Sequence, residues 1–259
     1  VLAFYDEHYP RDDGGKLLLK PAQALETWQK AINPLPPIAG LKYDLPRLLA
    51  LPRDLVGENL RQRWQRLLGE VPDLPRAEAE GEPVLAPAAK VLEGPRNIEN
   101  PELYAVFPYR LYGVGRPELD LARRTFAHRR IKSDRGWQQD GLQAACLGLG
   151  KKAARLLGSR VATKNPHARF PAFWGPNFDW VPDQDHGSHI LLTLQTMLLQ
   201  TVDHRLLVFP AWPRQWDVKF RLWAPGGAVV EGEYRDGQVV KVDVQPEARK
   251  KDLEVLAPQ

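Results

Sequence analysis

The feature that most constrains the fold of this 259-residue chain is a change in hydrophobic period after Asp203. Before that residue, apolar side chains recur at helical spacing, for example over residues 56–68. After it, apolar and polar residues alternate over residues 216–222, which is typical of a half-buried antiparallel strand. The sequence therefore predicts a mainly α-helical region over residues 1–203, followed by a small antiparallel β-sheet domain over residues 204–259.

Local signals subdivide both regions. Helices are expected over residues 44–51, 56–68, 116–130, 137–149, 151–161 and 188–202. Residues 72–87 contain four prolines and few large apolar residues, so a surface loop is expected there. In the second region, Asp236–Gly237 separates two alternating runs within residues 229–244, which predicts a β-hairpin.

Composition excludes several classes of protein. No stretch approaches the ~20 consecutive apolar residues of a transmembrane helix, so no membrane association is expected. A single cysteine, Cys146, rules out an internal disulfide and a multi-cysteine zinc site, and its apolar surroundings predict a core residue. The net charge of +4 is spread among acidic residues, which does not favour a nucleic-acid partner. His186 and His189 are three residues apart but lack a third ligand at a recognisable spacing, so neither metal nor cofactor is expected.

The loop over residues 170–189 has an unusual composition. It contains five aromatic residues, three carboxylates and two histidines. Aromatic faces stack on sugar rings, and carboxylates and amides bind hydroxyl groups, so Trp174, Asn177 and Trp180 are candidates for contacting a sugar. The structural alternative is a loop packed over the core, with an aspartate capping the helix that follows.

Two further segments carry candidate binding residues. Over residues 94–109, Asn100 and the residues after it suit a helix start, but Asn97 and Glu99 have no such explanation. Trp137 and Gln139 open a later helix and are equally consistent with hydroxyl binding or with packing. There is no nucleophile elbow, phosphate-binding loop or dinucleotide fingerprint. Carboxylates therefore remain as the candidate catalysts, and with aromatic neighbours they indicate chemistry on glycosides.

The order of the motifs resembles the C-terminal half of glycoside hydrolase family 95, whose members are six-hairpin (α/α) barrel glycosidases. The resemblance spans nearly the whole chain. The segments that carry it are Asn97–Tyr109, Gly136–Ala145, Asp183–Gly187, Met197–Gln200 and Val208–Trp216. The family's histidines are replaced by Asn97, Glu99 and Glu102, which indicates a divergent relative.

The resemblance implies a partial (α/α) barrel over residues 1–203, as the C-terminal half of a catalytic domain, with the β-sheet domain after it. It also implies an inverting glycosidase acting on an oligosaccharide or glycoside, and it favours a periplasmic or secreted location. The chain starts at Val1 rather than at a methionine, so we expect a fragment or a processed chain. Half a barrel leaves an apolar seam, and we expect a partner chain or the missing N-terminal half to cover it.

The resemblance also suggests the catalytic pair. Asp185 aligns with a family aspartate and precedes a helix N-terminus, so it is the expected base. Glu26 lies in a segment similar to the family's P-S-T-S-P-E-N, and Leu25 and Trp28 are placed to desolvate it, so it is the expected acid. Glu99 is the alternative acid. The expected substrate-binding residues are Asn97, Trp137, Gln139, Trp174, Asn177, Trp180 and His186.

The sequence is also compatible with two other functions. A polysaccharide lyase needs a base and a group that neutralises a uronate, which Arg96, Tyr104, Tyr109 and His186 could supply. A non-catalytic carbohydrate-binding fragment is the third possibility. Release of an unsaturated uronide would identify the lyase, and sugar binding without turnover would identify the binding fragment.

Overall fold

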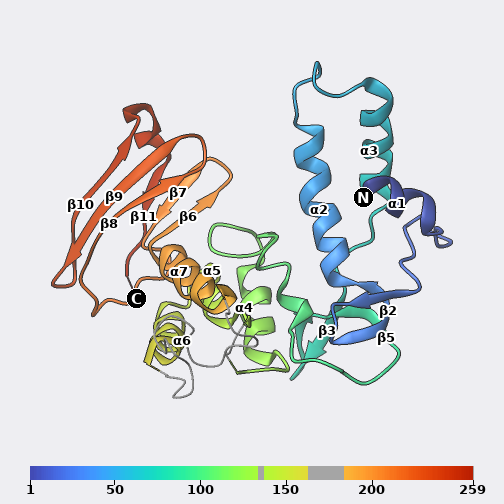
Figure 1. Ribbon diagram of the computed structural model, residues 1–259, viewed down its shortest axis with the longest axis horizontal. Helices are drawn as coiled ribbons and strands as arrows, with labels where there is room; N and C mark the ends of the chain where they lie inside the picture. The colour runs from blue at the N-terminus through green and yellow to red at the C-terminus, as the bar shows by residue number, and fades with distance from the viewer. Residues whose placement is uncertain (134–136, 163–183, 259) are drawn as a thin grey trace. The chain divides into compact units, whose positions relative to one another are not determined.

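The computed structural model describes residues 1–133, 137–162 and 184–258, and these residues form two compact units. The first unit consists of Val1–Tyr112 and Asp120–Ile131, and the second of Gly113–Leu119 and Lys132–Gln259. The ribbon in Figure 1 labels their helices and strands. No helix in the described part of the chain is long and apolar enough to cross a membrane.

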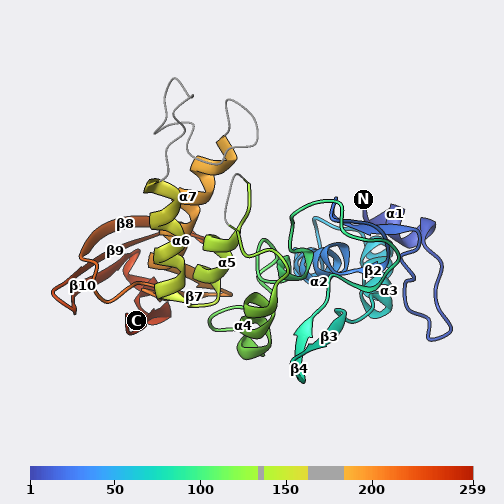
Figure 2. The same ribbon diagram turned by 90° about the horizontal axis from the view of Figure 1, so that it is seen from below.

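The first unit combines helices with two small sheets. Its helices are α1 (Leu2–His8), α2 (Leu35–Leu49), α3 (Glu58–Glu70), the short 3-10 helix η1 (Pro101–Leu103) and most of α4 (Leu119–His128). An antiparallel sheet of order β1-β2-β5 is formed by Ala22–Ala24, Trp28–Pro34 and Ala88–Val91. The strands β3 (Arg76–Ala79) and β4 (Glu82–Leu85) pair as a separate hairpin, visible in Figure 2.

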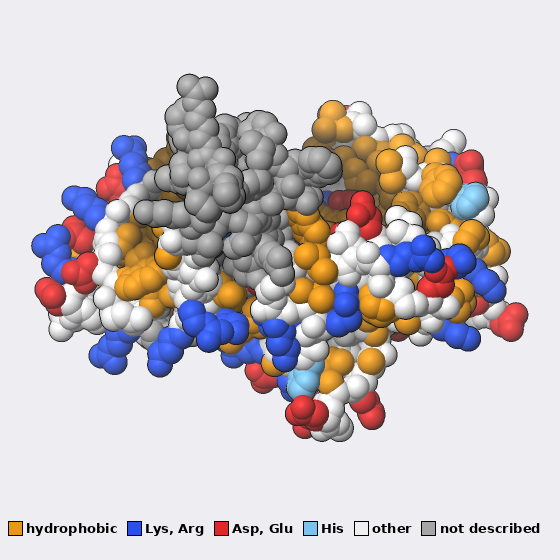
Figure 3. Space-filling model, turned by 60° about the horizontal axis from the view of Figure 1, so that its bottom comes forward, with side chains coloured by type: hydrophobic (Ala, Val, Ile, Leu, Met, Phe, Trp, Pro, Cys, Tyr) orange, Lys and Arg blue, Asp and Glu red, His pale blue; other side chains and the backbone are white. Residues whose placement is uncertain are grey.

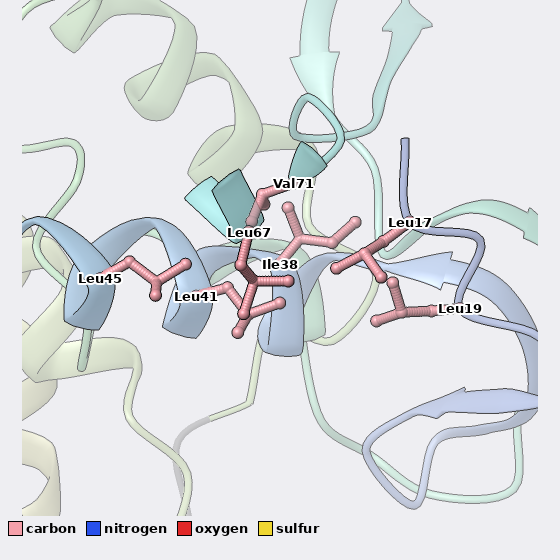
Figure 4. Close-up of a cluster of buried hydrophobic side chains, with 7 residues drawn as sticks. All are labelled: Leu17, Leu19, Ile38, Leu41, Leu45, Leu67 and Val71. Carbon is pink, nitrogen blue, oxygen red and sulfur yellow. The ribbon is translucent and has the colours of Figure 1, made fainter. Parts of the chain in front are cut away.

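The core of this unit lies between α2 and α3 (Figure 4). Side chains from α2, from the end of α3 and from the segment before β1 converge there. They are Leu17, Leu19, Ile38, Leu41, Leu45, Leu67 and Val71, each at most 3% exposed. In the same unit, the apolar side chains of Phe4, Leu55 and Leu60 are exposed. That a partner chain covers an apolar surface of this protein stays a prediction.

An ionic network joins α1 to α3. The carboxylate of Asp6 accepts hydrogen bonds from Arg11, Arg63 and Arg66 at 2.6–3.1 Å, and its side chain is only 5% exposed. Burial alone would raise the pKa of Asp6. The hydrogen bonds from the three arginines outweigh burial and lower this pKa to about 2.

We expect the replacement Asp6→Asn to destabilise the protein by about 2–3 kcal/mol near neutral pH, the free energy equivalent of the lowered pKa. Because the folded-state pKa lies below the unfolded value of 3.8, this contribution is present above about pH 4 and is lost as the pH falls toward about 2. Urea unfolding at a series of pH values tests this. Glu7→Gln, on the same helix but 70% exposed, is the control and should change little. A constant difference between Asp6→Asn and the wild type down to low pH would contradict the assignment.

The described part of the second unit has three α-helices, one 3-10 helix and two sheets. The helices are α5 (Asp140–Cys146), α6 (Gly150–Ala162) and α7 (Gln184–Leu198). The sheet of order β11-β7-β6 is built from Leu253–Val255, Arg205–Val208 and Leu199–Val202. The antiparallel sheet of order β10-β9-β8 is built from Gln238–Gln245, Ala228–Arg235 and Val218–Ala224, and the 3-10 helix η2 (Glu247–Asp252) leads from it to β11.

Aromatic packing joins the two sheets. The ring of Phe209, at the end of β7, is fully buried and lies 5.7 Å from Phe220 and 5.6 Å from Tyr234, measured between ring centroids. Gly232 on β9 makes room for this arrangement, since a Cβ there would lie 2.3 Å from the Phe220 ring. The hairpin between β9 and β10 turns at Asp236 and Gly237, both with positive φ, which confirms the predicted turn.

The expected fold class is wrong. Of the described residues, 38% are helical and 25% lie in strands, in four small sheets, so the chain is not mainly α-helical. The strands missed in the first region are three to seven residues long, which is too short for alternation to be recognised. The expected loop over residues 72–87 contains the β3–β4 hairpin.

Two local predictions also need correction. The expected helix after Asn100 is the three-residue η1 followed by turns. The helix expected over 188–202 ends at Leu198, and β6 begins at the next residue. The domain boundary expected at residue 203 falls in the turn between β6 and β7, two strands that pair with each other. The division into separate domains at this residue stays a prediction.

Candidate functional site

The candidate site begins at a tight turn between β1 and β2. Leu25 adopts a positive φ of 55°, and the turn lets Ala24 pair with Trp28. Glu26 is exposed at this turn. Its Oε2 accepts a hydrogen bond of 2.8 Å from Nδ2 of Asn97, which lies in the segment before η1. Two regions far apart in the sequence therefore meet at Glu26.

Thr27 fixes the same two segments together. Its side chain is fully buried, and both its backbone N–H and its hydroxyl donate to Oε2 of Glu99, at 3.0 and 2.9 Å. In return, the hydroxyl of Thr27 accepts a hydrogen bond from the backbone N–H of Glu99 at 3.1 Å. The backbone carbonyl of Thr27 also accepts a bond from Arg96 N–H. The carboxyl of Glu99 is thus held in one orientation.

The environment of Glu99 favours its protonated form. Partial burial is the main effect that raises the pKa of the Glu99 carboxyl, and the negative charge of Glu26 raises it further. The hydrogen bonds from Thr27 oppose this, because they favour the charged form, but the pKa remains above its usual value. Glu26 itself is exposed, so Leu25 and Trp28 do not bury its carboxyl as the sequence suggested.

A cavity of about 260 Å³ adjoins Glu99 within the first unit. Its lining residues include Trp28, Glu78, Glu99, Glu102, His128, Arg129 and Arg130. Burial of Glu102, which is 7% exposed, raises the pKa of its carboxyl to about 7. Since the charges of Arg130 and Arg129 act in the opposite direction, desolvation is the dominant effect on Glu102.

Arg130 links the cavity to the glutamate pair. Its Nη2 donates a hydrogen bond of 2.6 Å to the backbone carbonyl of Asn97. Its guanidinium carbon lies 5.7 Å from the centroid of the Trp28 ring. Arg130 therefore contacts both of the segments that carry Glu26 and Glu99.

The structure brings together three of the residues singled out in the sequence, namely Glu26, Asn97 and Glu99. The other expected residues belong to the second unit. Asp185 is exposed in the first turn of α7, and Trp137 and Gln139 precede α5. The side chains of Trp174, Asn177, Trp180 and His186 lie outside the described part of the structure.

Sequence reasoning missed Thr27, Glu102 and Arg129 as members of the site. The sequence suggests that Glu102 is an ordinary acidic residue at a helix N-terminus. Only its burial in the structure identifies it as a member of the site. Asn100, expected to cap a helix, makes no cap hydrogen bond. Its side chain instead donates to the carbonyl and accepts from the N–H of Ile131, which anchors the chain just after Arg130. The adjacent arginines at the end of α4 were the available signal for a charged site.

The site holds no recognisable metal centre, because no group of three potential ligands occurs within the described residues. No protein-family model matches this chain, and no curated protein matches it significantly. The resemblance to glycoside hydrolase family 95 therefore depends on the sequence motifs alone.

On the face shown in Figure 3, basic and acidic side chains are interspersed.

Proposed function

We propose that this chain is a glycoside hydrolase, or a part of one, in which Glu99 protonates the leaving oxygen. The observation that carries the proposal is the half-buried carboxyl of Glu99, which Thr27 orients, which lines a cavity and whose pKa the negative charge of Glu26 helps to raise. Hydrolysis of a glycosidic bond requires one carboxyl group that stays protonated at the working pH. Burial and a neighbouring negative charge are the two effects that keep a carboxyl protonated, and both act on Glu99.

The two glutamates differ in a way that suggests separate roles. Glu99 is half-buried and oriented by Thr27, whereas Glu26 is exposed and bound to the Asn97 amide. Glu99 is therefore the better proton donor, and Glu26 supports it through its charge. The resemblance implies Asp185, on α7 of the second unit, as the base, and this assignment stays a prediction.

Features of the same site argue against a lyase. A lyase base must lose its proton easily, but burial and the charge of Glu99 raise the pKa of Tyr104 to about 12, and burial also raises the pKa of Tyr109. Arg96, the expected uronate-neutralising group, is bonded to Glu93 at 2.6 Å. Neither tyrosine is suited to abstract a proton near neutral pH.

The test is to incubate the chain with a panel of oligosaccharides and aryl glycosides, and to follow reducing ends and ultraviolet absorbance together. We expect new reducing ends without absorbance from an unsaturated uronide. An increase in absorbance would instead identify a lyase. Sugar binding without either product would identify a non-catalytic binding protein.

A further inference from the structure

We propose that the hairpin of β1 and β2 carries a second sugar-binding cavity, which receives a ring bearing a sulfate or a carboxylate group. The substrate of the proposed hydrolase is then an acidic oligosaccharide. The inference rests on the proposed function only in taking the ligand to be a sugar, because neither Glu26 nor Glu99 lines this cavity.

The second cavity has a volume of about 330 Å³ and shares no lining residue with the cavity beside Glu99. Ligand sites commonly have volumes of roughly 300–1,000 Å³, so a sugar ring can be accommodated. The lining residues come from the segment before β1, from both strands of the hairpin and from the position after β5. They are Lys20, Pro21, Ala22, Gln23, Gln29, Lys30, Ala31 and Leu92.

The apolar part of this cavity lies on paired strands. Ala22 pairs with Ala31, and Ala31 pairs in turn with Val91 on β5 (β2 and β5 are labelled in Figure 1). Beyond the end of β5, the backbone N–H of Leu92 donates to the carbonyl of Lys30 at 2.9 Å. These hydrogen-bonded strands fix the backbone around the cavity, so the surface that a ring contacts is already formed before binding.

The charged side chains at this cavity are basic. Lys30 forms an ion pair with Glu93, but the carboxylate of Glu93 also pairs with Arg96 at 2.6 Å, so these three groups together keep a net positive charge. Within the described part of the chain, the ammonium group of Lys20 forms no ion pair or hydrogen bond. Of the described residues, none that lines the cavity is acidic. The cavity therefore presents positive charge to its occupant.

Two side-chain amides supply the groups that would bind sugar hydroxyls. Gln23 and Gln29 are exposed, and neither amide forms a hydrogen bond with another described residue. An amide both donates and accepts hydrogen bonds, as a hydroxyl group does, whereas an ammonium group only donates and binds anions most strongly. An acidic sugar uses the amides, the lysines and the apolar surface together, whereas a bare anion would use the lysines alone.

The cavity lies on the same hairpin as the turn that carries Glu26. Gln23 on β1 and Gln29 on β2 are each three residues from Glu26 along the chain. Three residues span at most about 11 Å. A sugar chain bound at the glutamate pair can therefore place a neighbouring ring in this cavity, and the acidic group then belongs to a ring other than the one that is cleaved.

The experiment is calorimetric titration of the chain with glucose, glucuronate and glucose 6-sulfate. We expect at least one of the acidic sugars to bind on the order of tenfold more tightly than glucose at low salt. This preference should decrease in about 1 M NaCl, because the Debye length is then only about 3 Å. Lys20→Gln should remove most of the preference, and Lys20→Arg should retain it. Lys90→Gln, on β5 of the same sheet but outside the cavity, is the matched control and should leave the preference unchanged.

Equal affinity for acidic and neutral sugars, or equal losses in Lys20→Gln and Lys90→Gln, would overturn the inference. Inorganic sulfate that binds as tightly as glucose 6-sulfate would also overturn it, because the sugar ring would then contribute nothing. A preference for only one of the acidic sugars supports the inference and identifies the anionic group. If the preference appears but no glycoside is hydrolysed, the proposed function fails and the binding of acidic sugars stands. Hydrolysis of neutral glycosides without a preference for acidic sugars has the opposite meaning.

Discussion

Replacing Glu99 with glutamine should lower kcat/KM for glycoside hydrolysis by about 10²- to 10⁴-fold, the usual contribution of a general acid. Glutamine can still accept the hydrogen bonds that Thr27 donates to Oε2, so the local structure should persist. The loss should be largest for alkyl glycosides and small for aryl glycosides with good leaving groups, because these need little protonation. Steady-state kinetics on the two substrate types measures the difference.

Glu26→Gln distinguishes the two glutamates. Removing the negative charge of Glu26 should lower the pKa of Glu99, so the basic limb of the pH–rate profile should move to lower pH. The maximal rate should fall much less than in Glu99→Gln. Glu58→Gln, at an exposed position on α3, is the control. A greater loss in Glu26→Gln than in Glu99→Gln would identify Glu26 as the acid.

Replacing Phe209 with alanine should destabilise the second unit by about 3–5 kcal/mol, the usual range for a buried phenylalanine. The fully buried ring contacts both Phe220 and Tyr234, so its removal leaves a cavity between the two sheets. Tryptophan fluorescence during urea unfolding measures the change, since Trp212 and Trp216 pack against each other in this unit.

Trp223→Ala is the matched control for Phe209→Ala. Trp223 lies on β8, the strand that also carries Phe220, but is 78% exposed, so its removal should cost less than about 0.5 kcal/mol. Equal effects of the two substitutions would contradict the packing of the two sheets around Phe209.

The sequence by itself predicted the helices and the hairpin that are specified by residues close together in the chain. The β9–β10 hairpin was recognisable because Asp236 and Gly237 adopt positive φ with little strain, and alternation continues on both sides. The helices α3, α5 and α6 were recognisable because their apolar spacing extends over one or more turns. Gly148, with a φ of 68°, follows the C-cap of α5, a position where glycine commonly ends a helix.

The fold class could not be obtained in this way. The sheet of β1, β2 and β5 pairs residues about 60 positions apart, such as Ala31 with Val91, and its strands are too short to show a period. Their pairing is selected by long-range contacts, which local propensity does not encode. The same holds for the β3–β4 hairpin within a proline-rich stretch.

The candidate site shows the same division. Residue types and motif order were sufficient to select Glu26, Asn97 and Glu99 one by one. Only the tertiary structure decided that they meet, because Thr27 bonds to a carboxyl 72 residues away. It also decided that the pKa values of Glu99 and Glu102 are raised, since both depend on burial. Burial is a property of all the segments that surround a side chain, and no local stretch of sequence specifies it.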